Sequence, residues 1–277
     1  MAYSASVLAN LQIHGHRGSR GSHPENTLPA FQEAVMAKAH VLELDMQLTA
    51  DDVVIISHEP SLTSALCRYT SGKPITAPIP IRSLRALELA QFECGAIAQA
   101  RFPEQKQIAG VPIPTFEAFL QWKAKNAPKL EMNIETKMTA DDPKWIPDPA
   151  LFATRVIELL RKHGVVEKAI LQSFDFRTLA AAKKIEPKLR LSCLFETEKD
   201  FCTLTHAQGA AFASPEKGLV TKEQVAACHK LGIQVVPWTA NAPEDWRRLL
   251  ECGVDAIITD YPRKLATFLT DLKKNKP

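Results

Sequence analysis

The chain has 277 residues, of which 45% are hydrophobic and 23% are charged, and these proportions are ordinary for a globular protein. The formal net charge of +3 is too small and too dispersed to indicate nucleic-acid binding. No apolar run approaches the roughly 20 residues that a membrane helix requires. A single α/β barrel occupies about 250 residues, so the length fits one domain.

The start of the chain and its cysteines bear on its location. The first residues, MAYSASVLANLQIHG, lack the basic start and the long apolar run of a secretory signal. The six cysteines are scattered, without a C-x-x-C pair or metal-ligand spacing, so we expect small thiols, buried or half-buried. Both features favour a cytoplasmic protein, although a periplasmic or secreted chain whose signal had been trimmed would look the same.

Strand and helix patterns alternate along most of the chain. The first elements are a strand at Leu11–His14, a helix to about Ala39 with Asn26 as a candidate N-cap, and strands at Val41–Met46 and Val53–His58. The interval between the last two strands is too short for a crossover, which needs about a dozen residues. From residue 115 the alternation is regular, with helices between strands near 130–136, 169–174, 189–195, 210–213, 233–238 and 254–259.

This alternation predicts a parallel sheet covered by helices, either an open doubly wound sheet or a closed barrel. The open sheet predicts a G-x-G-x-x-G loop after the first strand, and HGHRGSRG is rich in glycine but lacks that spacing. We count about nine strand candidates for the eight positions of a barrel, so one of them is extra or wrong. We predict a TIM (β/α)8 barrel, because the polar candidate residues fall at or near strand ends.

Residues 61–111 are the least regular stretch and carry several prolines. They read as an insertion after the third strand, which ends at His58. A loop of this length is usually functional, so we expect it to shape recognition of the substrate. We therefore predict one barrel domain over residues 1–277, with an insertion at about 61–111.

Acidic side chains share one face of two predicted strands. Side chains alternate along a strand, so Glu43 and Asp45 of LELD point the same way, as do Glu135 and Lys137 of MNIETK. They could be exposed residues on a half-solvated strand. In a covered sheet, however, a carboxylate pair is costly unless a cation lies between its members. Carboxylate oxygens suit a hard cation, Mg²⁺ or Ca²⁺, and the sequence does not separate the two.

Two histidines accompany the carboxylates. His16 and His58 each lie at or just beyond the end of an apolar strand, Arg17 follows His16, and Lys137 is two residues from Glu135. A lone histidine is usually structural, and both cations could be ordinary surface residues. Together with three carboxylates, however, this inventory suits metal-assisted hydrolysis of a phosphate ester.

These residues belong to a longer pattern. HRG, PENT, LELD and a strand ending in His58 are followed by IPTFEAFL, NIETK, QSFD, PWTAN and GVDAIITDYP. In this order, from Ile13 to Pro262, the segments resemble the glycerophosphodiester phosphodiesterase family. The resemblance implies a phosphoric diester hydrolase of glycerol and lipid metabolism. Such an enzyme cleaves substrates such as glycerophosphocholine or glycerophosphoethanolamine to sn-glycerol 3-phosphate and an alcohol.

The resemblance also implies a role for each candidate residue. It implies two catalytic histidines, His16 and His58, and three ligands of a divalent metal ion, Glu43, Asp45 and Glu135. It also implies two phosphate-binding cations, Arg17 and Lys137, and one wall of the substrate pocket, Trp238. The chain departs from the family at Glu59, where aspartate is usual, at Asp52, where glycine is usual, and at Thr136, where an aliphatic residue is usual. None of these departures removes a candidate group.

Two alternatives stay open. The first is a non-catalytic barrel that only binds its ligand, and the intact set of candidate residues argues against it. The second is a related phosphodiesterase acting on lysophospholipids, which would want an apolar entrance that the sequence does not clearly show. In each case we expect a small-molecule partner, no nucleic acid and no transmembrane segment, and the oligomeric state stays open.

Overall fold

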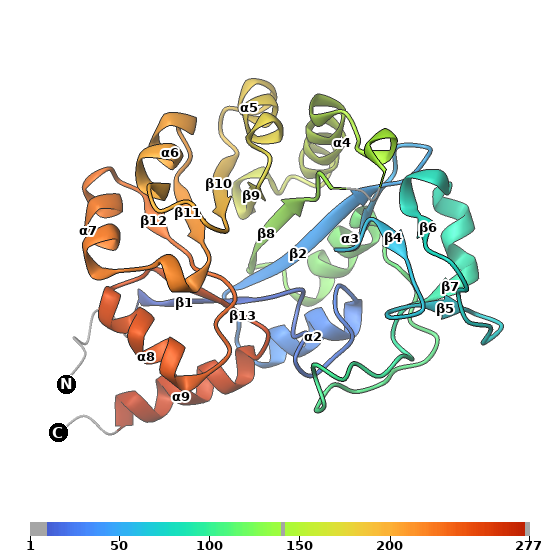
Figure 1. Ribbon diagram of the computed structural model, residues 1–277, viewed down its shortest axis with the longest axis horizontal. Helices are drawn as coiled ribbons and strands as arrows, with labels where there is room; N and C mark the ends of the chain where they lie inside the picture. Colours follow the sequence, from blue (N-terminus) through green and yellow to red (C-terminus); the bar gives the residue numbers. More distant parts are fainter. Residues whose placement is uncertain (1–9, 140–141, 275–277) are drawn as a thin grey trace.

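A computed structural model describes residues 10–139 and 142–274 of the chain. Eight parallel strands form a nearly closed barrel with helices around it, which confirms the predicted fold (Figure 1). The barrel strands are β1 (Gln12–Gly15), β2 (Val41–Leu48), β8 (Glu131–Thr136), β9 (Ala169–Ser173), β10 (Arg190–Phe195), β11 (Phe212–Pro215), β12 (Gln234–Val235) and β13 (Ala256–Thr259).

Helices cover the outside of the barrel. They are α2 (Leu28–Met36), α3 (Phe116–Asn126), α4 (Pro149–Lys162), α5 (Phe176–Ile185), α6 (Phe201–Gln208), α7 (Lys222–Lys230), α8 (Pro243–Cys252) and α9 (Pro262–Lys274). Three short 3₁₀ helices lie among them, η3 (Pro143–Trp145), η4 (Val166–Lys168) and η5 (Lys217–Leu219). No helix of the described ranges is long and apolar enough to cross a membrane.

Alternation along β2 separates the core from the site. Leu42, Leu44 and Met46 are fully buried and belong to one apolar cluster with residues of the covering helices, including Phe31 of α2 and Phe119 of α3. Burying each such side chain contributes about 1.5–3 kcal/mol. The residues between them in the sequence point into the barrel instead. The apolar half of the strand therefore anchors the strand while its acidic half is free to form a site.

The barrel closes where the first strand meets the last. β1 pairs in parallel with both β2 and β13, and Gln12 lies beside Ala256. The strand β12 is short, and separate backbone hydrogen bonds, such as the one from Ile258 N to Pro237 O at 3.0 Å, join the segment after it to β13. Residues from opposite ends of the sequence thus become neighbours at one edge.

The extra strand candidate, predicted at Val53–His58, lies outside the barrel. β3 (Val54–Ile56) pairs antiparallel with the end of β2, with Met46 beside Ile56. The turn between them contains Asp52 at φ 59°, where the family more often has glycine, and Arg82 Nη1 donates to its carboxylate at 2.6 Å. The segment expected to return without a helix is therefore a β-hairpin, and the insertion continues from it.

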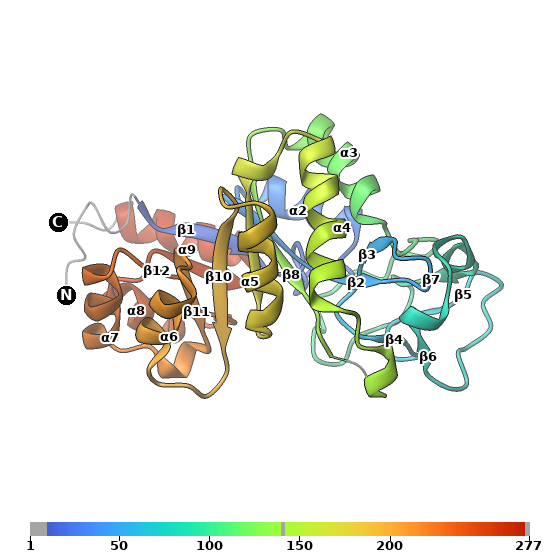
Figure 2. The same ribbon diagram turned by 90° about the horizontal axis from the view of Figure 1, so that it is seen from above.

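The insertion packs beside the barrel on the side away from α6, α7 and α8 (Figure 2). Its apolar cluster includes Leu62, Ile81 and Phe92, together with Ile55 of β3. A disulfide joins Cys67 near its beginning to Cys94 near its end. Its elements are β4 (Ser61–Leu62), β5 (Arg68–Tyr69), β6 (Ile79–Pro80), η1 (Ile81–Ser83), η2 (Ala86–Gln91) and β7 (Phe92–Glu93).

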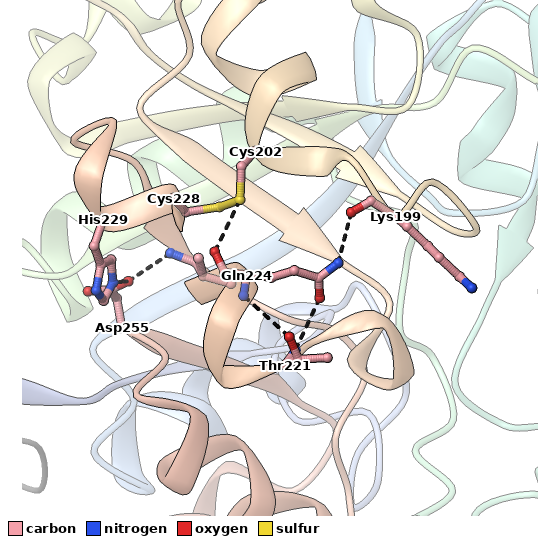
Figure 3. The surroundings of a disulfide bond; sticks show 8 residues. Lys199, Cys202, Thr221, Gln224, Cys228, His229 and Asp255 are labelled. Atoms are coloured by element: carbon pink, nitrogen blue, oxygen red, sulfur yellow. Dashed lines mark hydrogen bonds and ion pairs between the residues drawn. A yellow bond between two sulfur atoms is a disulfide. The ribbon is translucent and has the colours of Figure 1, made fainter. Parts of the chain in front are cut away.

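The expectation of thiols at all six cysteines was wrong for four of them. Besides the disulfide in the insertion, Cys202 at the start of α6 is bonded to Cys228 near the end of α7 (Figure 3). Only Cys193 and Cys252 are free. The paired cysteines are 26 and 27 residues apart, so the chain must fold before they meet, and local spacing carries no sign of the pairing.

Candidate active site

The predicted site residues meet at the carboxyl ends of the barrel strands. One cavity of about 170 Å³ lies there, and seven of the eight predicted residues line it, namely His16, Arg17, Glu43, His58, Glu135, Lys137 and Trp238. The eighth, Asp45, is buried beside Glu43 and Glu135. Functional groups belong at this end of a TIM barrel, because loops from several strands converge there.

The three carboxylates form one cluster. Oxygen atoms of Glu43, Asp45 and Glu135 lie within 4.8 Å of one another, and all three side chains are buried. Parallel pairing of β2 with β8 causes this, because it sets Asp45 beside Glu135. Burial raises the pKa of Glu43 well above its usual range, and the neighbouring Asp45 raises it further. Burial also raises the pKa of Glu135. The surrounding protein therefore disfavours the charged forms of Glu43 and Glu135.

Asp45 shows how the cluster fits a cation. Burial works to raise its pKa, but the Arg17 guanidinium and other nearby cations hold it well below the usual range, so the side chain is an anion. Its Oδ2 atom accepts a hydrogen bond from Asn26 at 2.9 Å. Its Oδ1 atom has no hydrogen-bond partner among the described residues. A buried carboxylate oxygen left in this way beside two more carboxylates suits a divalent metal ion.

Two cations alternate with the carboxylates. Arg17, at φ 49°, donates its backbone N–H to Glu43 at 2.8 Å and its Nη1 to Glu25 at 2.7 Å. Lys137 Nζ donates to Glu135 at 2.8 Å. Burial works to lower the pKa of Lys137, but Glu135 and Asp45 raise it above its usual value. Both cations therefore stay charged at the cavity wall, where an anionic ligand could meet them.

His16 is held by a buried carboxylate that the sequence did not single out. Its Nδ1 lies 2.6 Å from Asp260 Oδ1, and Asp260 also accepts from Arg20 Nε at 2.9 Å and from Asn241 Nδ2 at 2.7 Å. Burial lowers the pKa of His16 to about 4, although Asp260 acts to raise it. His16 is therefore neutral near pH 7, with its Nδ1 proton directed to Asp260 and its Nε2 left as an acceptor.

His58 reaches the same cavity from the hairpin rather than from a barrel strand. Its Nδ1 lies 2.8 Å from Glu59 Oε1, and the hydrogen bond from His58 lowers the pKa of the Glu59 carboxyl. Although Glu59 stands where the family usually has aspartate, its carboxylate still forms a hydrogen bond with His58 Nδ1. The side chain of His58 is 28% exposed, against 10% for His16, so the two imidazoles face different surroundings.

The family model described as "Glycerophosphoryl diester phosphodiesterase family" matches residues 16–264. The chain belongs to this family. The match confirms the resemblance seen in the sequence, and with it the expected class of enzyme.

Individual relatives agree with this assignment. A glycerophosphodiester phosphodiesterase of Caldanaerobacter subterraneus subsp. tengcongensis is 29% identical over 257 residues, which cover 90% of this chain and 94% of the relative. The crystal structure of a "putative glycerophosphoryl diester phosphodiesterase" from Silicibacter pomeroyi is 29% identical and has a TM-score of 0.89, over 95% of this chain and 94% of the other. An Oleispira antarctica phosphodiesterase in complex with the product sn-glycerol-3-phosphate has a TM-score of 0.77 at 21% identity, over 95% and 99% of the two chains.

In this phosphodiesterase-family chain, PENT serves the site more than the helix. Thr27, not Asn26, caps α2, and its hydroxyl accepts from Ala30 N at 3.4 Å. Asn26 adopts φ 58° and holds Asp45 through both side-chain amide atoms. The expectation that Asn26 caps the helix was therefore wrong. The physical reason is the positive φ, which turns its side chain toward β2 instead of the helix end.

A chain of amides also holds Glu43 in this family member. Gln172 Nε2 donates to Glu43 Oε1 at 2.9 Å, and Asn133 Nδ2 donates to Gln172 Oε1 at 2.9 Å. Gln172 lies in QSFD, one of the segments that carry the family resemblance, and the sequence analysis did not identify Asn133 as a site residue. Its inward parity with Glu135 on the same strand was the available signal.

Aromatic residues form the outer part of the phosphodiesterase cavity. Trp238 follows β12, and its Nε1 donates to Ser214 O at 2.8 Å. Its ring meets that of Phe174 edge-to-face, with centroids 5.5 Å apart. Phe174 is 44% exposed. Trp238 and Phe174 therefore both line the cavity, and the sequence analysis missed Phe174 within QSFD.

Proposed function

We propose that the chain hydrolyses glycerophosphodiesters, such as glycerophosphocholine or glycerophosphoethanolamine, to sn-glycerol 3-phosphate and an alcohol with the help of a divalent metal ion. The convergence of a buried three-carboxylate cluster, two paired cations and two histidines on one cavity carries this proposal. Family membership supports the reaction class. The product bound to the Oleispira antarctica relative supports the expected substrate class.

Glu43, Asp45 and Glu135 would hold the metal ion, Mg²⁺ or Ca²⁺, because their oxygens converge and Asp45 Oδ1 accepts no hydrogen bond from any described residue. Such an ion supplies positive charge that stabilises the phosphoryl oxygens as the reaction proceeds. The amides of Asn26 and Gln172 orient two of the three carboxylates. Residues that fix a metal ligand in this way typically matter for affinity.

Arg17 and Lys137 would bind the phosphate oxygens. Arginine offers a planar fork that matches two oxygens, and lysine offers a point charge. Both already form ion pairs with Glu25 and Glu135 at 2.7 and 2.8 Å, so their positions are fixed before the substrate arrives. Trp238 would form one wall of the same pocket.

His16 and His58 would carry the proton transfers. One group must accept the proton of the attacking hydroxyl, and another must donate a proton to the departing alkoxide. His16 suits the base, because it is neutral and Asp260 holds the proton on Nδ1. His58, which follows the hairpin strand β3, then serves as the acid. The attacking hydroxyl belongs to water or to the glycerol moiety.

We propose that the insertion and the barrel form one domain, because the hairpin joins them through direct strand pairing. Two disulfides favour an oxidising compartment, against the cytoplasmic location that the sequence favoured.

A second cavity next to His58 gives the lysophospholipid alternative no support. It is bounded by apolar residues of the insertion such as Leu62 and Leu66. Its volume is about 40 Å³, enough for only a few water molecules and not for an acyl chain.

The test is a panel of glycerophosphodiesters with release of glycerol 3-phosphate measured under Mg²⁺, Ca²⁺ and EDTA. We expect release that requires a divalent ion. Glu43→Gln and Asp45→Asn should each lose most activity while unfolding at a denaturant concentration close to that of the wild type. Full turnover after exhaustive chelation would contradict the metal requirement. No release from any member would favour the barrel that only binds.

A further inference from the structure

One side chain of the insertion reaches into the barrel cavity. Arg101 lines the cavity together with His16, Glu135 and Lys137, although it lies far from them in the sequence and outside every helix and strand. It is exposed, whereas the three barrel residues are buried. Arg101 therefore lies at the outer part of the cavity and the carboxylate cluster at its inner part.

The loop that carries Arg101 is fixed to the barrel. Phe102 is only 6% exposed, and its ring lies 4.8 Å from the guanidinium carbon of Arg20. Gln105 Nε2 donates to Arg20 O at 2.7 Å, and Lys106 N donates to Ser22 O at 3.0 Å. These contacts hold the loop against the segment that follows β1. Arg101 is therefore presented to the cavity by an anchored backbone, which lowers the entropy cost of using it for binding.

Arg101 also differs from the other cations of the cavity in its charge balance. Arg17 pairs with Glu25 and Asp45, and Lys137 pairs with Glu135. Arg20 pairs with Asp260 at 2.9 Å. Arg101 forms no ion pair within the described ranges. Its guanidinium contacts the Phe102 ring, with 5.5 Å between the guanidinium carbon and the ring centroid.

The position of an unpaired cation limits what it can recognise. If the phosphate sits at the carboxylate cluster, the groups attached to it extend toward the outer part of the cavity. Glycerol is neutral and gives a guanidinium no counter-charge. An anionic substituent on the alcohol does, because a carboxylate or a phosphate accepts two parallel hydrogen bonds from arginine.

We propose that Arg101 makes the enzyme prefer glycerophosphodiesters whose alcohol carries an anionic group. A carboxylate such as that of the serine headgroup is the chemistry that it would bind. This inference rests on the proposed function and adds a substrate preference to it. It also gives the insertion a defined part in recognition, through one side chain.

The test compares two substrates that differ by one carboxylate, glycerophosphoserine and glycerophosphoethanolamine. We would measure kcat/KM for both under the same metal ion with the wild type and with Arg101→Gln, Arg101→Lys and Arg101→Glu. We expect the wild type to prefer the serine diester, and Arg101→Gln to lower the serine-to-ethanolamine ratio about fivefold, as for an exposed ion pair. Arg101→Lys should keep part of the preference, and Arg101→Glu should reverse it.

Lys73 provides the matched control, because it is an exposed cation of the same insertion that does not line the cavity. Lys73→Gln should leave the ratio unchanged. Both substrates are measured on one preparation, so a loss of folded protein cancels in the ratio.

Three outcomes would overturn the inference. An equal fall on both substrates would place Arg101 at the scissile phosphate, and an unchanged ratio in Arg101→Gln would leave it without a role in selection. A wild type that is inactive on every diester would instead remove the proposed function and this inference with it. Only that outcome leaves all the variants without activity.

Discussion

Replacing Asp260 with asparagine tests the assignment of His16 as the base. Asp260 is fully buried and holds His16, Arg20 and Asn241 at 2.6, 2.9 and 2.7 Å. Asparagine keeps the shape and one acceptor oxygen but removes the charge. It can also turn its amide N–H toward Nδ1, which would place the histidine proton on Nε2 and remove the acceptor.

The expected losses follow from these contacts. We expect kcat/KM to fall about 100-fold, because general base catalysis contributes about 10²–10⁴-fold and the imidazole itself remains. Stability should fall by about 3 kcal/mol, because Arg20 stays buried while its nearest remaining carboxylate, Glu25, lies 3.7 Å away.

The pH dependence of this stability loss has a definite sign. The pKa of Asp260 is held far below its usual value, where burial acts upward and His16 and Arg20 act downward more strongly. Its contribution is therefore present above its unfolded pKa of about 4 and is lost as the pH falls toward the folded value. The stability difference between wild type and Asp260→Asn should accordingly narrow below about pH 4.

The control lies at the other end of the same strand. Asp255 precedes β13 and accepts from His229 Nε2 at 2.9 Å, so Asp255→Asn also removes a carboxylate from a histidine, but away from the cavity. Kinetics with a glycerophosphodiester, urea unfolding and calorimetric metal titration would be run on both variants. Metal affinity should stay near that of the wild type. Wild-type kcat/KM in folded Asp260→Asn, or an equal loss in Asp255→Asn, would refute the reasoning.

Two further predictions concern parts of the chain outside the site. Burial lowers the pKa of His14 to about 3. The unfolded chain therefore takes up a proton that the native chain refuses, so His14 alone contributes about 2 kcal/mol to the stability lost between pH 7 and pH 5. Urea unfolding of His14→Leu should show a loss that is smaller by this amount, and exposed His206→Gln should show the wild-type loss. Replacing Cys67 and Cys94 with alanine should raise KM and protease cleavage within the insertion. Replacing both Cys202 and Cys228 with alanine should lower stability by about 3 kcal/mol and leave KM unchanged. A raised KM in this variant, with an unchanged KM in the Cys67 and Cys94 variant, would contradict the roles given to the two disulfides.

The carboxylate cluster could be predicted because it depends on local periodicity. Alternation within β2 puts Glu43 and Asp45 on one face, and the same rule applies to Glu135 in β8. The structure adds only that the two strands are neighbours in register. The barrel was predictable for a similar reason, since repeated strand and helix patterns limit the choice of fold.

Features that depend on distant contacts could not be predicted. The predicted barrel already puts β13 beside β1, but the sequence does not show that the side chain of Asp260, rather than another residue after β13, reaches His16. The disulfide partner of Cys202 likewise depends on how α6 and α7 pack. Asn26 escaped for another reason: its role comes from a positive φ, which residue type indicates only weakly.

The position of β13 has a consequence for how the enzyme becomes active during synthesis. During synthesis β1 is the first barrel strand to emerge from the ribosome. Its neighbour β2 emerges next, whereas its other neighbour β13 is the last of the barrel strands. His16 lacks its carboxylate until Asp260 has left the exit tunnel. A nascent chain can thus form much of its sheet while the site stays incomplete. The site is complete only when the last strand has added Asp260 beside His16.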